Sequence, residues 1–420
     1  MHQIPRHIRP QLVASLKEAR VACLLGARQS GKSTLVRAVA ANEHPARYLT
    51  LDDAETLQFA REDPVGFVSG ADPLVIDEIQ REPELLLAIK RVVDIDETRG
   101  RFLITGSANI VTHPRVADAL PGRVDYMTLW PFSQAELAER RSTFLEVAFA
   151  GTAPRAENPP VGRSGYVERV VAGGFPEAVQ AGPNRRHRFF SGYVDSILSR
   201  EIDELGSVRD VESTTRLLHL VAARSGALTN LSSLGRELGV NHKTVANRLH
   251  SLEQLFTIIR LPAWHTNLGR RVVRSAKLHL ADTGMLCSLI GADAGRLERD
   301  GEIAGSVFET FAVGEVVRQA SVGKFSTQLH LNHYRDQRGN EVDLVLEQFS
   351  GEVVGIEIKA SATPSFSDTA GLRLLRERLG DRFRQGILLH LGPDTIPLGD
   401  RIAAVPLAAL WQDRHSPDKS

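Results

Sequence analysis

Between an apolar run and a helical pattern, the chain reads Gly26-Ala27-Arg28-Gln29-Ser30-Gly31-Lys32-Ser33-Thr34. The apolar run is Val21 to Leu25, and the helical pattern is Leu35 to Ala41. A GxxxxGK[ST] pattern at a strand-to-helix junction is typical of a phosphate-binding loop, or P-loop. Its glycines permit a tight turn, so that backbone N–H groups and the helix N-terminus surround a phosphate. We expect Lys32 to reach the β- and γ-phosphates and the Ser33 hydroxyl to bind Mg²⁺, and the nine residues together predict nucleoside triphosphate binding.

A second segment, Pro73 to Ile79, reads as a short buried strand that ends in two carboxylates, Asp77 and Glu78. In parallel α/β sheets, nucleotides bind at the carboxyl ends of the strands. Downstream of a P-loop, this pattern predicts that Asp77 holds Mg²⁺ through a water and that Glu78 orients the attacking water. The alternative is a strand that simply ends in a polar turn.

A third predicted strand, Arg101 to Thr105, is followed by Gly106-Ser107-Ala108-Asn109. Polar side chains at this position can sense the γ-phosphate of a bound nucleotide. Thr105, Ser107 and Asn109 are all candidates, and the sequence does not choose among them. Asp52 and Asp53 close an earlier strand, but for this pair we favour ordinary turn chemistry.

Composition is that of an ordinary globular chain, with 420 residues, 42% apolar and 24% charged. The formal net charge is zero, so contacts with nucleic acid or an anionic membrane would have to come from local patches. Cys23 and Cys287, the only cysteines, have apolar neighbours, which fits buried free thiols in a reducing compartment. No apolar signal core and no long apolar run are found, which predicts a cytoplasmic protein without membrane contact.

Changes in pattern divide the chain into five predicted parts. Residues 1–150 alternate strand and helix patterns, as expected of a doubly wound parallel sheet. Residues 151–210 begin as a Gly- and Pro-containing linker and continue as a helical segment. Compact helices and β-like pairs fill residues 211–300, a second α/β unit fills residues 301–411, and residues 412–420 form a tail.

The third of these parts predicts a helix-turn-helix, in which Leu231 to Leu238 and Asn241 to Leu255 are joined at Gly239. Strands at Ile258 to Leu261 and Arg274 to Leu280 would supply a wing. The predicted phosphate-contacting residues on the second helix and the wing are Lys243, Asn247, Arg248, His250, Arg270, Arg271, Arg274 and Lys277. A winged helix is also a common packing module, so DNA contact and a purely structural role both stay open.

The fourth part contains carboxylates and a lysine in a pattern that suits metal-dependent phosphodiester hydrolysis. Glu309 lies on a predicted helix, Asp343 on a predicted strand, and Glu357 and Lys359 two apart on the next strand. A turn at Ser350-Gly351 would fold the two strands into a hairpin, which brings Asp343 toward Glu357. Asp343 and Glu357 would bind Mg²⁺, and Lys359 would position the attacking water. The alternative is an ordinary half-exposed strand, where Glu and Lys two apart are commonplace.

Taken together, these motifs resemble the AAA+ superfamily ATPases with an AAA_14 core and a DUF4143 region. The AAA_14 resemblance rests on the P-loop and on Tyr48-Leu49-Thr50-Leu51-Asp52-Asp53, Ile76-Asp77-Glu78-Ile79-Gln80, Gly106-Ser107, Pro121-Gly122-Arg123 and Gly173-Gly174-Phe175-Pro176. The DUF4143 resemblance rests on Val240 to Gly291, with Asn267-Leu268-Gly269 and Asp282-Thr283-Gly284, and on Glu341-Val342-Asp343 and Ile356-Glu357-Ile358-Lys359.

The resemblance implies an α/β fold with a P-loop AAA+ core, a winged helix and a restriction-endonuclease-like domain of the PD-(D/E)xK type. It implies ATP and Mg²⁺ as cofactors and a homo-oligomer with ATP sites at subunit interfaces. Arg123 would then be an arginine finger for a neighbouring subunit, or a structural ion pair. Two functions stay open: an ATPase that acts on DNA through the nuclease-like domain, and a nucleotide-controlled regulatory or binding protein in which that domain is catalytically inactive.

Overall fold

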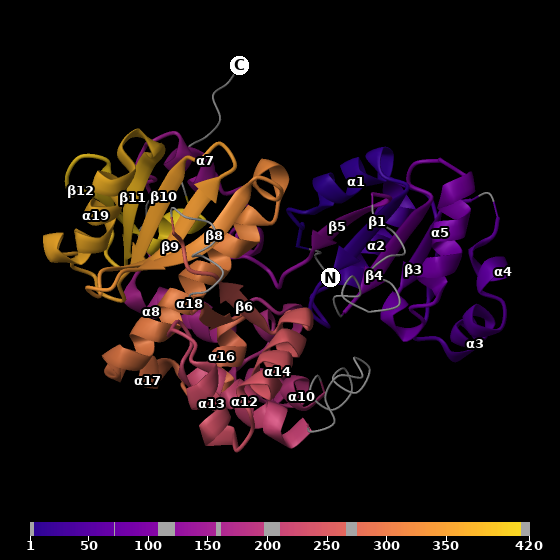
Figure 1. Ribbon diagram of the computed structural model, residues 1–420, viewed down its shortest axis with the longest axis horizontal. Helices are drawn as coiled ribbons and strands as arrows, with labels where there is room; N and C mark the ends of the chain where they lie inside the picture. Colours follow the sequence, from indigo (N-terminus) through magenta and orange to yellow (C-terminus); the bar gives the residue numbers. More distant parts are fainter. Residues whose placement is uncertain are drawn as a thin grey trace.

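The computed structural model describes residues 4–70, 72–107, 122–156, 161–196, 211–265 and 275–412. Figure 1 shows three groups of elements: a five-stranded sheet with its helices, a six-stranded sheet with its helices, and a mainly helical group below and between them. Several residues named above lie outside the described ranges, and they are Ala108, Asn109, Pro121, Asn267, Leu268, Gly269, Arg270, Arg271 and Arg274.

The five-stranded sheet is wholly parallel, in the order β2-β3-β4-β1-β5. Its strands are β1 (Val21–Leu25), β2 (Arg47–Thr50), β3 (Leu74–Asp77), β4 (Phe102–Gly106) and β5 (Val124–Thr128). The helices of this unit are α1 (Arg9–Glu18), α2 (Lys32–Asn42), α3 (Ala54–Glu62), α4 (Pro64–Val68) and α5 (Leu85–Ile95). The predicted α/β fold with a parallel sheet is confirmed.

Strand β1 explains why the sheet is covered on both faces. All five of its residues are buried, and alternate side chains enter different apolar clusters. Ala22 and Leu24 pack with α1 and α2, while Cys23 packs in the cluster that contains Ile89 of α5. Because successive strand residues point to opposite faces, a continuous apolar run such as this requires helices on both sides.

The helical group contains α6 (Gln134–Leu137), α8 (Arg163–Ala172), α9 (Pro176–Val179), α10 (Pro183–Ser196), α12 (Val211–Ala223), α13 (Leu231–Leu238), α14 (His242–Gln254), α16 (Thr283–Leu289) and α17 (Ala294–Arg299). Asn230 and Asn241 cap α13 and α14, and Gly239 ends α13 with a φ of 68°. Strands β6 (Ile258–Leu261) and β7 (Lys277–Leu280) follow as an antiparallel pair.

Two of the basic residues predicted to face DNA are buried, so that part of the prediction is wrong. Arg248 is 5% exposed and donates a hydrogen bond to the Ser213 hydroxyl, because α14 turns this side chain toward α12. Lys277 is 2% exposed and faces a group of carboxylates described below. Lys243, Asn247 and His250 lie on the exposed side of α14, as expected.

The six-stranded sheet is mixed, in the order β12-β13-β11-β10-β9-β8. Its strands are β8 (Leu329–Arg335), β9 (Glu341–Gln348), β10 (Val353–Ile358), β11 (Phe383–His390), β12 (Ile396–Pro397) and β13 (Ile402–Pro406). Its helices are α18 (Gly301–Ala320) and α19 (Ala370–Leu379). Short 3-10 helices in the chain are Ile79–Arg81, Gly323–Phe325, Phe366–Thr369, Gly380–Arg382 and Leu407–Leu410.

Helix α7 (Phe144–Phe149) belongs spatially with this second sheet, although residues 1–150 were predicted to form one nucleotide-binding unit. It packs against β10 and β11, and its Phe149 ring stacks on Phe325 at 5.7 Å. The Arg384 guanidinium also donates to the Phe149 carbonyl at 3.2 Å. An apolar helix without a polar face needs such a buried location.

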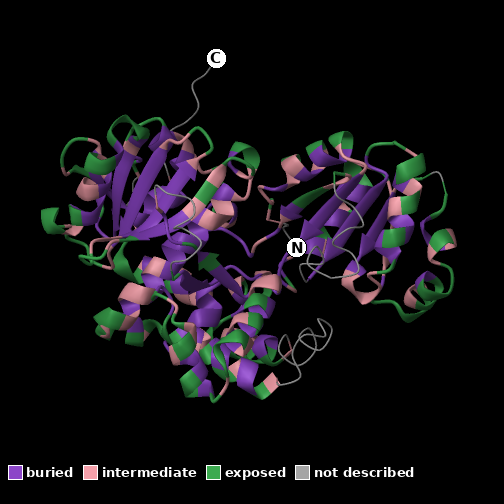
Figure 2. Cartoon of the chain, in the orientation of Figure 1, coloured by how far each residue is buried: buried purple, intermediate pink, exposed green. Residues whose placement is uncertain are grey.

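Figure 2 shows the buried strands of both sheets in purple, with exposed residues concentrated on the outer helix faces and loops. Among the described residues, no helix is both long enough and apolar enough to cross a membrane.

Candidate functional sites

The P-loop closely follows the carboxyl end of β1. Gly26 has a φ of 153°, and a Cβ there would lie 2.2 Å from the Leu129 carbonyl oxygen, so only glycine fits. Gly31 has a φ of 99° and immediately precedes α2. Helix α2 begins at Lys32, and its first N–H groups are therefore available to an anion in the loop.

Lys32 points back over the loop. It is 3% exposed, and its Nζ donates to the carbonyl oxygens of Gly26 at 2.9 Å and Ala27 at 3.0 Å. The Ser30 hydroxyl is buried. Within the described residues it neither donates nor accepts a hydrogen bond. Uncharged carbonyls that hold an ammonium can yield it to a phosphate, and an unsatisfied buried hydroxyl is suited to bind one. The loop therefore fits a nucleotide phosphate.

Asp77 is buried at the carboxyl end of β3. The P-loop follows the carboxyl end of β1 in the same parallel sheet. The hydroxyl groups of Tyr48 and Thr105 both donate to its carboxylate. Burial raises the pKa of Tyr48 to about 12, and the hydrogen bond to Asp77 adds to this shift. The Tyr48 hydroxyl therefore stays protonated at neutral pH. Together with the Thr105 hydroxyl, it orients the carboxylate that was predicted to hold Mg²⁺ through a water.

Glu78 has the backbone geometry of a specialised position. Its φ of 61° lies in the left-handed region, which a side chain such as Glu rarely adopts. Its carboxylate accepts a hydrogen bond from the Gln80 amide at 2.5 Å, and the same amide donates to the Ser107 hydroxyl at 2.7 Å. Gln80 thus joins Glu78 to the next strand end. This role was not predicted, because no local pattern distinguishes Gln80 from a turn residue.

The three residues that could sense the γ-phosphate have different surroundings in the structure. Thr105 is buried against Asp77, and Ser107 contacts Gln80. Asn109 falls outside the described residues. Asp53 caps α3 through the Thr56 N–H at 2.8 Å, in agreement with the turn chemistry expected for it.

Arg123 lies on the far side of the same sheet. It precedes β5, and its carbonyl accepts from the N–H of Val21 at the amino end of β1, whereas the P-loop follows the carboxyl end. Its guanidinium forms an ion pair with Asp94. Arg123 therefore cannot reach the nucleotide of its own chain.

Two residues distant in sequence hold the P-loop backbone. The Arg6 guanidinium donates to the Ser30 carbonyl at 2.9 Å and pairs with Glu136 at 3.1 Å. From the other side, the Tyr193 hydroxyl of α10 donates to the Arg28 carbonyl at 3.1 Å. Neither residue belongs to a motif, so the sequence does not predict that they contact the P-loop.

Hydrogen bonds to the adjacent residues Trp130 and Pro131 connect this loop with the end of β7. Arg6 also donates to the carbonyl of Trp130, which precedes Pro131. Arg318 of α18 donates to the Pro131 carbonyl at 3.0 Å and to the Ala281 carbonyl at 2.9 Å. Ala281 directly follows β7, so the nucleotide-binding unit and the β6–β7 pair share one arginine.

The motifs at Gly173-Gly174 and Asp282 form a structural junction. Asp282 accepts from the N–H of Gly174 at 2.7 Å, and a Cβ on Gly173 would lie 2.3 Å from the Asp282 carboxylate. Burial raises the pKa of Asp282, although the nearby Arg318 guanidinium opposes this shift. The glycines are needed for close packing rather than for chemistry.

A second candidate site lies where β9 begins and β10 ends in the six-stranded sheet. Strands β9 and β10 are antiparallel neighbours with Leu344 opposite Ile356, which brings Asp343 next to the end of β10. One Asp343 oxygen accepts from the N–H of Ile358 at 3.0 Å. Lys359 follows the strand and donates to Glu357 at 2.9 Å. Asp343, Glu357, Lys359 and Glu309 all line one cavity of about 570 Å³.

Lys277 of β7 occupies the centre of this carboxylate group. Its Nζ lies 2.9 Å from Glu309, 2.6 Å from Glu341 and 3.0 Å from Asp343. Although burial disfavours its charge, Asp343, Glu309 and Glu341 raise the pKa of Lys277 above its usual value. Lys277 is thus a charged ammonium at neutral pH, and it does not face DNA as the predicted wing required.

The carboxyl groups of Glu309 and Glu357 have pKa values above those of ordinary surface acids. Burial and the neighbouring Asp343 charge raise the pKa values of Glu309 and Glu357 to about 8 each. Burial, with the charge of Lys277, lowers the pKa of His279 to about 3, which keeps that imidazole neutral. The site therefore holds protons readily near neutral pH.

Within the described part of the chain, no three or more His, Cys, Asp or Glu side chains are arranged to hold a metal ion. Around Lys277 the carboxylate oxygens lie 2.6 to 3.0 Å from the Nζ atom, which are hydrogen-bond distances. Mg²⁺ would need its oxygen ligands at about 2.0–2.1 Å. Glu309, Asp343 and Glu357 do converge as expected, but around a lysine.

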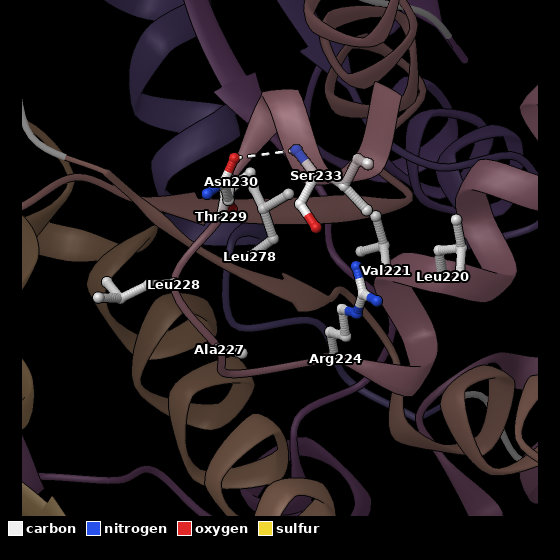
Figure 3. Close-up of a pocket in the computed structure, with 10 residues that line it drawn as sticks. Leu220, Val221, Arg224, Ala227, Leu228, Thr229, Asn230, Ser233 and Leu278 are labelled. Carbon is white, nitrogen blue, oxygen red and sulfur yellow. Dashed lines mark hydrogen bonds between the residues drawn. The ribbon is translucent and has the colours of Figure 1, made fainter. Parts of the chain in front are cut away.

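A smaller cavity of about 230 Å³ adjoins this site. Figure 3 shows its apolar side chains, among them Val221 and Leu278, with Arg224 at one side. Arg224 is paired with Glu237 at 2.7 Å. Ala227 and Leu228 line both cavities, so this short segment separates them.

Family models match three consecutive parts of the chain. A model described as an AAA domain, AAA_14, matches residues 18–138, which contain the parallel sheet and the whole P-loop. A domain of unknown function, DUF4143, matches residues 304–410, which contain the six-stranded sheet. The chain therefore contains an AAA domain of the AAA_14 type and a DUF4143 C-terminal region. Residues 163–296 match a further domain of unknown function, DUF8612.

The extent of DUF4143 differs from the resemblance described above. That resemblance placed Val240 to Gly291 with DUF4143, whereas the family models assign this segment to DUF8612. The two regions meet in space at Lys277, which DUF8612 contributes to a site whose carboxylates belong to DUF4143.

Relatives match this chain over most of its length. An uncharacterized protein of Mycobacterium tuberculosis is 29% identical over 400 residues, covering 94% of this chain and 82% of the relative. An uncharacterized protein of Haemophilus influenzae is 23% identical over 289 residues, covering 63% of this chain and 68% of the relative. Among solved structures, the Walker-type ATPase of Pyrococcus abyssi matches with a TM-score of 0.43 and 16% identity, covering 68% of this chain and 96% of that chain.

Proposed function

We propose that this AAA+ protein hydrolyses ATP with Mg²⁺ and couples the resulting conformational change to hydrolysis of DNA phosphodiester bonds in its C-terminal region. The observation that carries the proposal is the convergence of Asp343, Glu357 and Lys359 in one open cavity. In this proposal residues 211–300 act as a winged helix that grips DNA, and residues 301–411 act as a restriction-endonuclease-like domain.

At the P-loop, Lys32 leaves its carbonyl partners to bind the β- and γ-phosphates, and the first N–H groups of α2 bind the phosphate oxygens. Ser33 and Asp77 would hold Mg²⁺, which neutralises charge that develops on the phosphates. Glu78 orients the attacking water, and Gln80 fixes the Glu78 carboxylate. The left-handed backbone at Glu78 supports this role, because such strain concentrates at functional positions.

Arg123 acts, in this proposal, on the γ-phosphate of a neighbouring subunit in a homo-oligomer. Its side chain is 31% exposed beside a similarly exposed Asp94, and such a surface ion pair costs little to break. Its position at the amino edge of the sheet suits a role between chains, and the alternative is the structural ion pair with Asp94.

In the C-terminal cavity, Asp343 and Glu357 would hold a divalent ion that lowers the pKa of a bound water. Lys359 stands beside Glu357 and is 39% exposed, so its ammonium can contact both the water and a phosphate. The exposed face of α14, with Lys243, Asn247 and His250, would contact the DNA backbone.

One observation favours the second function, a nucleotide-controlled regulatory protein with an inactive nuclease-like domain. Lys277 fills the centre of the carboxylate group, where a nuclease needs its metal. An ammonium satisfies the carboxylates electrostatically but does not activate water.

Cleavage of duplex and single-stranded DNA with Mg²⁺ and ATP separates these functions. We expect wild type to cleave DNA, and Asp343→Asn and Lys32→Ala each to reduce cleavage by at least about 100-fold. Glu347→Gln is the matched control, since Glu347 lies on the same strand, pairs with Arg382 and does not line the cavity. Cleavage that persists in Asp343→Asn would contradict the nuclease assignment, and absence of cleavage in wild type would favour the regulatory function.

A further inference from the structure

Lys277 reaches its carboxylate partners from a different sheet. Strand β7 pairs only with β6 among the described strands, while Glu341 and Asp343 belong to β9 and Glu309 to α18. The contact therefore ties the β6–β7 pair to the start of β9 and to α18. A buried ammonium with three carboxylate partners replaces the water that each charge would otherwise bind.

The charges around Lys277 match those of a cation site. Glu309, Glu341, Asp343 and Glu357 supply four carboxylates, and Lys277, Lys359 and Arg335 supply three cationic groups. At a pH above about 8, where Glu309 and Glu357 are also ionised, the cluster carries one surplus negative charge. Without Lys277 it would carry two, which is the charge that a divalent ion neutralises.

Glu357 supplies an independent indication that a cation belongs here. The residue is 8% exposed and lines the cavity, and its Oε2 has no hydrogen-bond partner although its Oε1 accepts from Lys359. When Glu357 is ionised, this buried oxygen lacks a donor, which is costly, and a metal ion is a partner that it can take.

We propose that Lys277 is an internal cation that closes this site, so that its ammonium and a divalent ion bind the same carboxylates in mutually exclusive fashion. Both Asp343 oxygens are already used, one by Lys277 and the other by the N–H of Ile358. A divalent ion bound to Asp343 and Glu357 would also face the Lys277 ammonium, which lies 3.0 Å from Asp343, and repulsion between the two positive charges sets them in competition for this carboxylate. This inference rests on the proposed function, since it concerns the same Asp343 and Glu357.

The position of β7 offers a route by which the nucleotide affects this closure. Arg318 binds the carbonyl of Ala281 at the end of β7 and the carbonyl of Pro131 in the segment that Arg6 also holds. A shift of the P-loop would thus act on the strand that carries Lys277.

The test is calorimetric titration of Mn²⁺ into the nucleotide-free full chain. We expect Lys277→Met and Lys277→Gln to bind one Mn²⁺ ion at least about 100-fold more tightly than wild type, because a competing positive charge is removed within 3.0 Å of Asp343. Lys277→Gln keeps a hydrogen-bond donor for the carboxylates and guards against a Met variant that does not fold. Lys277→Arg keeps the charge and is the matched control, with wild-type affinity expected. Addition of Asp343→Asn to either neutral variant should abolish the gain.

Two results would overturn the inference, and they differ in what they mean for the proposed function. Equal Mn²⁺ affinity in wild type and Lys277→Gln, lost in both on Asp343→Asn, would show that metal and lysine bind together. The nuclease assignment would then survive without the closure. Failure of every variant to bind Mn²⁺ at millimolar concentration would remove the metal site itself, and with it both proposals.

Discussion

The two candidate sites each contain a buried lysine, but the partners of that lysine differ. Lys32 is held by the carbonyl oxygens of Gly26 and Ala27, which carry no charge. Lys277 is held by the carboxylates of Glu309, Glu341 and Asp343. An incoming phosphate can replace carbonyls around Lys32, whereas only a cation can replace the ammonium of Lys277. The first lysine is prepared to receive an anion, and the second already acts as the counter-ion of its site.

The largest difference should appear in stability. Lys277→Met leaves three carboxylates around an uncharged side chain, so we expect the free energy of unfolding to fall by about 3–5 kcal/mol. Lys359→Met is the control, because that lysine is 39% exposed and should cost no more than about 1 kcal/mol. Urea denaturation of the three proteins measures both values. Similar small losses in both variants would mean that Lys277 is not a structural counter-ion.

The next effect concerns nucleotide affinity. Lys32→Ala should weaken ATP binding by about 100-fold, since the phosphate loses a charged donor inside a buried loop. Lys277→Gln should bind ATP as wild type does, because it lies in the other site. Fluorescence titration with an ATP analogue gives the affinities. A comparable loss of affinity in Lys277→Gln would break the distinction between the two lysines.

A smaller effect concerns pH. The pKa values of Glu309 and Glu357 rise from an ordinary 4.5 to about 8 on folding, so the folded state binds more protons than the unfolded state between these values. Their contribution to stability is therefore complete below about pH 4.5 and is lost as the pH rises through about 8. We expect Glu357→Gln to flatten the decline in the free energy of unfolding between pH 5 and pH 8. An unchanged slope would show that Glu357 is ionised across this range.

The smallest expected change tests the support of the P-loop. Tyr193→Phe removes one hydrogen bond to the Arg28 carbonyl, a contribution of about 1 kcal/mol, and should weaken ATP binding by about fivefold. Phe189→Leu is a control on the same helix, because it changes packing and leaves the hydroxyl contact in place. An unchanged affinity in Tyr193→Phe would mean that α10 does not help to hold the nucleotide loop.

The nucleotide site was predictable from the sequence, since its decisive residues are contiguous or end successive strands. The P-loop contains its glycines, lysine and hydroxyl within nine residues, and Asp77 and Glu78 directly follow an apolar run. Parallel pairing then brings these strand ends together without further information.

The second site was predictable only in part. A hairpin placed Asp343 near Glu357, as the turn at Ser350-Gly351 indicated. Lys277 was assigned to a DNA-facing surface because its partners lie 32 or more residues away. The available signal was the alternation in β7, where Lys277 and His279 are two apart among apolar residues and so share one buried face. Arg6 had no such signal, because its partners Ser30 and Glu136 are reached only through the tertiary fold.

The most direct test of the central claim is steady-state ATP turnover of wild type and Glu78→Gln, each with and without duplex DNA. The account predicts Mg²⁺-dependent turnover that DNA increases in wild type, and turnover at least about 100-fold lower in Glu78→Gln at unchanged ATP affinity. Turnover equal in the two proteins would contradict the assignment of Glu78 and of the ATPase site. Turnover that no DNA alters would contradict coupling to DNA and leave the nucleotide-controlled regulatory function.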